Sequence, residues 1–317
     1  MTRSAAPDLF SRGAAAFGLV ATVKAPTEQL LAFLTWHLDQ GASHISLYFD
    51  DPDDPAHDAC RRLAGPAQLS LTRCDARHWA RLKGRPDRHQ NRQSKNAAHA
   101  YRASRLDWLG HIDCDEFLLA RQQPLSEMLA SLPSGQILCR AEPFEAMHDP
   151  SLADDIYTAR AFRGALKAGH AALRGKVMGR YASYLPEAML SHSVGKALFR
   201  CGISGLSPRL HGAFMGGERL PGPPFQPGLQ LLHFHAQDRA AWTRALPFRL
   251  TRGAYQYHPQ LQAFLSAASP EEIADFYDET QILTPEKSRI LRDAGRLAET
   301  DLRLTSRIAT WKRGEDQ

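Results

Sequence analysis

The sequence of 317 residues lacks any long hydrophobic run and contains few cysteines. No stretch approaches the roughly 18–20 apolar residues that a membrane-spanning helix needs, and residues 1–17 contain no long apolar core ahead of a cleavage site. The five cysteines are widely spaced and form no CxxC pair, which favours a reducing compartment and argues against a thiolate zinc site. We therefore expect a cytoplasmic protein whose only membrane contact would be peripheral, at the inner face.

The sequence also lacks internal repeats, low-complexity segments and a strong excess of one charge. Hydrophobic residues make up 43% and charged residues 23%, close to the averages for a soluble globular protein. The formal net charge of +5 is spread along the chain. This distribution suits anionic small molecules or an anionic membrane surface better than a nucleic-acid groove.

Short apolar runs alternate with amphipathic segments over the first 140 residues. The pattern predicts strands at 17–23, 44–49, 68–73, 108–112 and 136–141, and helices at 27–40, 55–64 and 90–104. Such alternation implies an α/β fold with parallel strands, whose carboxyl ends bind ligands. The chain is rich in Gly and Pro from about 143 to 228 and helical from Arg239 onward. We expect one domain over 15–238 and a helical C-terminal extension over 239–317, packed on the same domain.

The strand predicted at 108–112 runs directly into three carboxylates, Asp113, Asp115 and Glu116. Asp113 and Asp115 flank a single residue, so the two can share a hard divalent cation, directly or through water, and with it hold a diphosphate. Oxygen ligands suit Mg²⁺ or Mn²⁺. A DxD tripeptide alone is weak support, because acidic residues often follow a strand, but its place after a buried strand favours a metal site.

Two further clusters could complete such a site. The basic segment 81–96 precedes the acidic strand, and Arg92 and Lys95 lie beside a predicted helix start, where they could neutralise a leaving diphosphate. An exposed, solvated loop is the competing interpretation. His233 and His235 alternate in an apolar run, which places both imidazoles on one face as metal ligands or as a structural pair.

Several motifs in order resemble the nucleotide-sugar-dependent glycosyltransferases of family 2 type. They are Val23-Lys24, FLTWHL at 33–38, GASH at 41–44, YFDD at 48–51 and HIDCDEFL at 111–118. The chain looks most like the bacterial branch whose metal motif reads lDvDEFl, over residues 17 to about 145. The resemblance implies a GT-A fold, with a Rossmann-like and mostly parallel sheet flanked by helices. It also implies a nucleoside diphosphate sugar donor, Mn²⁺ or Mg²⁺, and usually inversion at the anomeric carbon.

Carried over by position, the resemblance implies roles for individual residues. Asp113, Asp115 and His233 would hold the metal, with His235 as second choice to His233 and Glu116 as a supporting residue. Lys196 would face the donor phosphate or the acceptor, while Lys24 and the loop beginning at Asp50 would lie near the base and ribose. The expected donor-binding residues are Lys24, Asp50, Asp51, Asp53, Arg92, Lys95, Asp113, Lys196 and His211.

An inverting transfer needs a carboxylate that removes the proton of the acceptor hydroxyl. Glu142 and Glu145 follow the strand predicted at 136–141, where such a group could reach the donor sugar. We name both as candidate catalytic bases, against the alternative that either is an ordinary surface carboxylate.

The predicted function is transfer of a sugar from a nucleoside diphosphate to a hydroxyl of a saccharide or a lipid-linked acceptor, in surface polysaccharide synthesis. No nucleic-acid partner is expected. The chain departs from the family at Ala25, Pro26 and Ala32, where the family has Asn, Glu and Glu. These losses favour one alternative, a catalytically silent relative that binds saccharide or a partner protein. A nucleotidyltransferase is weaker, because no Gly-rich phosphate loop follows the first strand.

Overall fold

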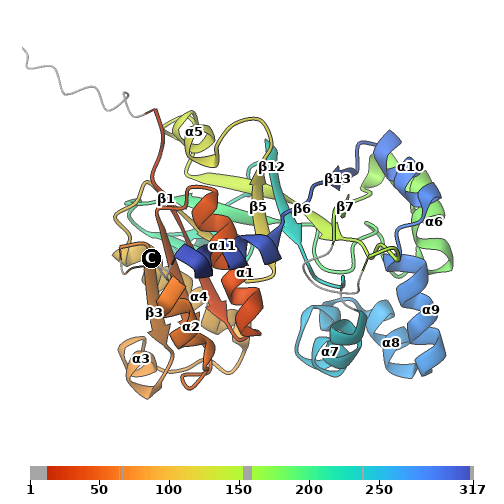
Figure 1. Cartoon of the computed structure of the whole chain (residues 1–317), viewed down its shortest axis with the longest axis horizontal. Coiled ribbons are helices and arrows are strands. Elements are labelled where there is room, and N and C mark those ends of the chain that lie inside the picture. Colours follow the sequence, from red (N-terminus) through yellow and green to blue (C-terminus); the bar gives the residue numbers. More distant parts are fainter. Residues whose placement is uncertain (1–12, 64, 66, 153–158, 238, 315–317) are drawn as a thin grey trace, which may run out of the picture.

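A ten-stranded sheet forms the centre of the computed structural model, which describes residues 13–63, 65, 67–152, 159–237 and 239–314 (Figure 1). The main strand order is β13-β7-β6-β8-β4-β1-β2-β3, and β12 pairs with both β5 and β6. The strands are β1 (Phe17–Val23), β2 (His44–Phe49), β3 (Leu69–Arg73), β4 (Trp108–His111), β5 (Glu116–Ala120), β6 (Leu138–Ala146), β7 (Ala161–Gly164), β8 (Lys196–Arg200), β12 (Phe225–His233) and β13 (Leu297–Glu299).

The sheet is mixed. Strands β3, β2, β1 and β4 pair in parallel, as their alternation with helices requires. From β4 the pairing turns antiparallel through β8, β6, β7 and β13, while β12 runs parallel to β6 and antiparallel to β5. A small antiparallel sheet of β9 (Leu206–Arg209), β10 (Gly212–Met215) and β11 (Glu218–Arg219) lies apart from it. The predicted α/β class, a sheet flanked by helices, is confirmed.

Helices pack on the parallel half and gather again at the far end of the sheet (Figure 1). Those of the first half are α1 (Thr27–Asp39), α2 (Ala56–Leu63), α3 (Ala76–Arg81), α4 (His89–Ala103) and α5 (Leu125–Ala130). Those that follow are α6 (Ala171–Met178), α7 (Arg239–Thr251), α8 (Pro259–Ala267), α9 (Pro270–Gln281), α10 (Pro285–Asp293) and α11 (Leu304–Gly314). Three short 3₁₀ turns are η1 (Ala168–His170), η2 (Gly179–Tyr181) and η3 (Ala254–Tyr257).

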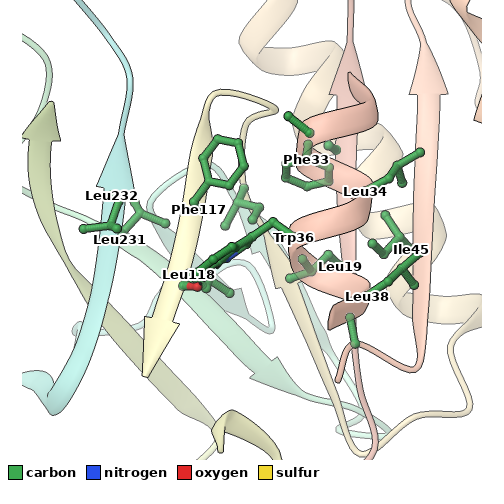
Figure 2. Packing of buried hydrophobic residues seen from close by; sticks show 14 of the residues in the cluster. Leu19, Phe33, Leu34, Trp36, Leu38, Ile45, Phe117, Leu118, Leu231 and Leu232 are labelled. Atoms are coloured by element: carbon green, nitrogen blue, oxygen red, sulfur yellow. Dashed lines mark hydrogen bonds between the residues drawn. The ribbon is translucent and has the colours of Figure 1, made fainter. Parts of the chain in front are cut away.

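Helix α1 is the most deeply buried helix of the first half. All nine residues from Leu30 to Leu38 are buried, because α1 packs against α2, α11 and β5 as well as the sheet. Figure 2 shows Phe33 and Trp36 of α1 beside Phe117 and Leu118 of β5. The Trp36 indole donates to the Leu118 carbonyl at 2.9 Å, so the one polar atom of this large side chain is satisfied. This packing fixes β5, and with it the turn that joins β4 to β5.

The region predicted as an extension, 239–317, is not purely helical in the structure, since β13 pairs with β7. Its helices α7 to α10 enclose a second core with Trp242, Tyr255, Phe276 and Tyr277, while α11 returns to α1. The division at 238/239 stays a prediction. Residues 1–12 of the segment examined for a signal peptide, and residues 238 and 315–317, lie outside the described residues. Among the described residues, no helix is both long and apolar enough to span a bilayer.

Candidate functional site

A tight turn from β4 into β5 carries the three acidic residues of the sequence motif, Asp113, Asp115 and Glu116. The Asp113 N–H donates to Glu116 Oε2 at 2.7 Å, and the Glu116 N–H donates to the Asp113 carbonyl at 3.1 Å. These two bonds leave the Asp113 and Asp115 side chains 29% and 27% exposed, whereas the Glu116 carboxylate is fully buried. The turn therefore presents two carboxylates to the surface and keeps a third beneath them.

Lys196, at the start of β8, neutralises two of these carboxylates from inside the protein. Its ammonium lies 2.6 Å from Asp113 Oδ2 and 3.4 Å from Glu116 Oε2, and its side chain is buried. Gln93 of α4 donates to the other Asp113 oxygen at 2.5 Å. Burial alone would raise the pKa of Asp113, but the Lys196 charge outweighs it and holds that pKa well below its usual value. Asp113 is thus ionised and fixed in orientation.

Three histidines surround the buried carboxylate. His192 Nε2 lies 3.0 Å from Glu116 Oε1, and its ring centroid is 5.4 Å from that of His233 and 4.5 Å from that of His211. His233 reaches Asp115 Oδ2 at 3.4 Å and the Ser191 hydroxyl at 3.1 Å.

Two of these imidazoles differ in charge. Burial would lower the pKa of His233, but the negative charge of Asp115 outweighs it and raises the pKa to about 9. Burial, reinforced by the nearby charges of His233 and Lys196, lowers the pKa of His192 to about 3. At neutral pH His192 is neutral, which is the form of imidazole that binds metal.

The donor set can hold a divalent transition metal. Glu116, His192 and, once metal has displaced its proton, His233 each offer a ligand atom, and these atoms all lie within 4.8 Å of one another. His192 Nδ1 is buried without a hydrogen-bond partner in the described part of the chain. Carboxylate oxygens beside imidazole nitrogens suit Mn²⁺ better than Mg²⁺, which prefers oxygen ligands alone. The predicted trio of Asp113, Asp115 and His233 shares only His233 with this group, although all five side chains converge at the β4–β5 turn.

Strand pairing brings these distant residues together. His233 ends β12 directly opposite Glu116 of β5, and the Phe234 N–H donates to the Asp115 carbonyl at 2.9 Å. His235, the second-choice ligand, has its Nε2 2.9 Å from the Tyr255 hydroxyl and packs beside His233, with 5.2 Å between ring centroids. His235 therefore packs against the metal ligand His233 and is not itself one of the grouped ligands.

Of the predicted donor-binding residues, Lys24 follows β1, the aspartates 50, 51 and 53 follow β2, and Arg92 and Lys95 lie on α4. Arg92 forms a two-point ion pair with Asp50, at 2.7 and 2.8 Å, so each satisfies the other. The Lys95 ammonium donates to the carbonyls of Leu82 and Gly84 at 2.8 and 2.9 Å. Lys24 and Asp53 are exposed, and Asp51 accepts from the Asp53 N–H. His211, from the far side, holds the Gly195 carbonyl at 3.0 Å.

The two predicted catalytic bases are both paired with arginines. Glu145 is buried and accepts from Arg163 at 3.0 Å, from the Leu190 N–H at 2.9 Å and from the Ser191 N–H. Burial would raise the pKa of Glu145, but Arg163 and these hydrogen bonds lower it. Because both oxygens are engaged and water is excluded, these contacts argue against its role as a base. Glu142 is 28% exposed and pairs with Arg296 at 2.7 Å.

Sequence reasoning missed His192 and Gln93. His192 lies in an irregular segment without hydrophobic period, and its single available signal is its position four residues before Lys196. Gln93 lies in the basic segment 81–96, where a neutral amide carries no signal beside so many charged residues. Glu116 was assigned only a supporting role, although it sits at the centre of the cluster.

Comparisons with known proteins give a loose structural likeness only. No protein-family model matches the sequence, and no curated protein matches it. Among solved structures, the chain is similar to the mannosyltransferase PcManGT from Pyrobaculum calidifontis, determined in complex with GDP-Man and Mn²⁺. The two are 11% identical, with a TM-score of 0.37, and the match covers 96% of this chain and 81% of that chain. At this level the likeness assigns no residue, so the interpretation of the site rests on its own geometry.

Proposed function

We propose that the chain is a metal-dependent glycosyltransferase of GT-A type, which transfers a sugar from a nucleoside diphosphate to a hydroxyl of a saccharide or lipid-linked acceptor. The observation that carries this proposal is the convergence of Asp113, Asp115, Glu116, His192 and His233 on one turn at the carboxyl end of β4. The motif resemblance over residues 17 to about 145 supports it. Surface polysaccharide synthesis is the pathway that this resemblance favours.

Asp115, Glu116, His192 and His233 would hold Mn²⁺ at this turn. When bound, the metal supplies positive charge that stabilises the departing diphosphate. Lys196 and Gln93 hold Asp113 ionised and oriented toward the surface, so that it can take part in the same site. Since β2, β1 and β4 are parallel neighbours, the Asp50–Arg92 pair lies on the same sheet edge, where it could contact the nucleoside.

The transfer also needs a base that accepts the proton of the acceptor hydroxyl. Of the two predicted carboxylates, Glu142 is the more accessible, since its side chain is partly exposed and pairs with Arg296, and regular pairing of β6 points it to the opposite face of the sheet from Glu145. Glu142→Gln should then reduce transfer while leaving hydrolysis of the donor by water less affected, since water needs less help from a positioned base. Equal transfer by the variant would contradict this role.

A specific observation favours the catalytically silent alternative. The Lys196 ammonium already pairs with Asp113 and Glu116, and so offsets part of the negative charge that a metal would otherwise balance. Together with the substitutions Ala25, Pro26 and Ala32, this could mean a saccharide-binding relative that needs no metal.

Calorimetry with UDP and with GDP, each with and without Mn²⁺, tests the proposal. We expect tight nucleotide binding only with Mn²⁺, and hydrolysis of a nucleotide sugar under the same conditions. Asp115→Asn should abolish both, because it removes a charged ligand of the metal, whereas Asp293→Asn, at the exposed end of α10, serves as the matched control. Binding that is the same with and without Mn²⁺ would favour the silent relative instead.

A further inference from the structure

An open cavity of about 600 Å³ lies beside α4, on the opposite side of that helix's first turns from Asp113. The end of α3, one face of α4 and strand β9 form its walls. Its lining residues are Arg81, Leu82, Lys83, Pro86, Asn91, Ser94, Lys95, Ala98, Arg102, Ser207 and Arg209. None of the residues assigned above to the metal belongs to this lining.

The lining holds five cations and no carboxylate. Among the described residues, no ion pair neutralises any of the five, and Arg81, Lys83 and Arg102 have exposed side chains without a hydrogen-bond partner. Lys95 and Arg209 are held in place instead by neutral groups, Lys95 by backbone carbonyls and Arg209 by the Ser207 hydroxyl at 2.9 Å. Like charges gathered around one hollow repel each other, and an anion bound there relieves that repulsion.

The backbone at Lys83 adds an independent observation. Lys83 follows the end of α3 in the left-handed region, with φ of +60°, a conformation that glycine adopts far more readily. The same turn ends α3, since the Gly84 N–H donates to the Trp79 carbonyl at 2.8 Å and the Lys83 N–H to the Ala80 carbonyl at 3.2 Å. The left-handed turn places Lys83 in the cavity wall.

The cavity adjoins the candidate active site through two shared elements. On helix α4, Gln93 donates a hydrogen bond to Asp113, and the next two residues, Ser94 and Lys95, line the cavity. On β9, the Arg209 carbonyl accepts from His111 Nδ1 at 3.4 Å, and His111 lies two residues before Asp113. The cavity and the turn that carries Asp113 and Asp115 are therefore held in place by the same two elements, α4 and β9.

We propose that this cavity binds an anionic group, phosphate or carboxylate, of the sugar acceptor, and so selects acidic acceptors. The inference rests on the proposed glycosyltransferase function and names its acceptor class. The donor's diphosphate belongs at the Asp113–Asp115 turn, where a metal would meet it, so a second cationic site on the other side of α4 remains for the acceptor. Arginine is suited to this task, because its planar group binds the oxygens of phosphate or carboxylate in pairs.

The test is a set of titrations of the full chain without metal or nucleotide. Glucose 6-phosphate and glucuronate serve as acidic probes, with glucose and inorganic phosphate as references. At least one acidic probe should bind, more tightly than either reference, and added salt should weaken it. Arg81→Gln combined with Arg102→Gln should weaken that binding at least about tenfold, because two charge-assisted contacts are lost. Both side chains are exposed, so the fold should survive. Arg62→Gln, an exposed arginine on α2, should change nothing.

Four outcomes would overturn the inference. They are failure of both acidic sugars to bind, unchanged binding by the double variant, inorganic phosphate binding as tightly as glucose 6-phosphate, and displacement of the acidic sugar by UDP without metal. The last would assign the cavity to the donor. Asp115→Asn should lose Mn²⁺-dependent nucleotide binding but retain acidic-sugar binding. The two measurements therefore distinguish failure of the glycosyltransferase proposal from failure of the acceptor proposal.

Discussion

Glu145 lies where neither water nor a substrate hydroxyl can reach it, between Arg163 and the backbone of Leu190 and Ser191. Glu145→Gln removes the charge that balances the buried Arg163 guanidinium. Loss of one partner of a buried pair costs about 3–5 kcal/mol, so we expect urea denaturation to show a fall of that size in the free energy of unfolding. Glu142→Gln, in a partly exposed pair, should cost about 1 kcal/mol or less. Normal stability with lost transfer would instead identify Glu145 as the base.

Lys196 offers a second test at the level of a single side chain. Lys196→Met preserves most of the side-chain volume but leaves Asp113 and Glu116 facing each other without a cation. We expect the variant to unfold at lower temperature in metal-free buffer, and Mn²⁺ to raise its melting temperature more than that of the unmodified chain, because the metal replaces the missing charge. Differential scanning calorimetry with and without Mn²⁺ measures both. An equal Mn²⁺ effect on the two proteins would show that Lys196 and the metal occupy separate places.

Individual site residues could be predicted from the sequence only where a local pattern marks them. Asp113 and Asp115 stand out because they follow an apolar strand, and His233 because it ends one. His192 and Gln93 carry no such mark, because the sequence of an irregular loop or of a polar helix face does not reveal whether that segment faces a site. Their roles depend on the pairing of β12 with β5 and on the docking of α4, which are long-range contacts.

The contact between α1 and β5 contains a neutral histidine, His37. His37 Nδ1 donates to the Phe33 carbonyl at 2.8 Å, and Nε2 accepts from the Leu118 N–H at 3.1 Å, so both ring nitrogens are satisfied only in the uncharged form. The ring also stacks on Phe117, with 5.7 Å between centroids. Burial accordingly lowers the pKa of His37 to about 3.

The buried His37 should make the free energy of unfolding depend on pH. Because the folded-state pKa lies below the unfolded value of about 6.5, the unfolded chain binds the proton first as pH falls. Stability from His37 is complete above about pH 6.5 and decreases toward pH 3, by about 2 kcal/mol at pH 5. Other buried histidines add to the slope, so the comparison is with His37→Gln. Urea denaturation at pH 7.5 and pH 5 should show a smaller pH effect in the variant. An unchanged slope would mean that His37 does not resist protonation.

Helices and strands could be predicted where an apolar run or an amphipathic pattern continues over the whole element. The strands β1 and β2 match their predicted bounds, and α4 differs by one residue at each end. In contrast, β7, β9 and β10 have four residues each, within the Gly- and Pro-rich region, which is too short for a period of two to show. Strand β5 could not be predicted from the sequence, because its first residue, Glu116, belongs to the acidic motif. A buried carboxylate in a strand is unexpected unless its partner, here Lys196, is known.

At the scale of the whole molecule, the chain returns to its beginning. After four helices around the second core, β13 rejoins the sheet and α11 packs on α1 (Figure 1). Trp311 Nε1 donates to Asp39 at 3.1 Å, and the Arg307 guanidinium pairs with the same carboxylate. The buried side chains Leu304 and Ile308 belong to the same core as α1. The last helix thus stabilises the first half of the fold, on whose β4–β5 turn the candidate site lies.

Removal of α11 should therefore weaken a site to which it contributes no residue. A chain that ends at Leu302 exposes the apolar surface of α1 that Leu304 and Ile308 cover, at about 1.5–3 kcal/mol for each lost side chain, so we expect urea denaturation to show a loss of about 3–6 kcal/mol. Since α1 also supports β5 through Trp36 and His37, Mn²⁺ affinity should fall as well. Lys312→Ala, on the exposed side of α11, is the control. If the shortened chain kept its stability and its Mn²⁺ affinity, α11 would be a separate appendage and the β4–β5 turn would be held by the sheet alone.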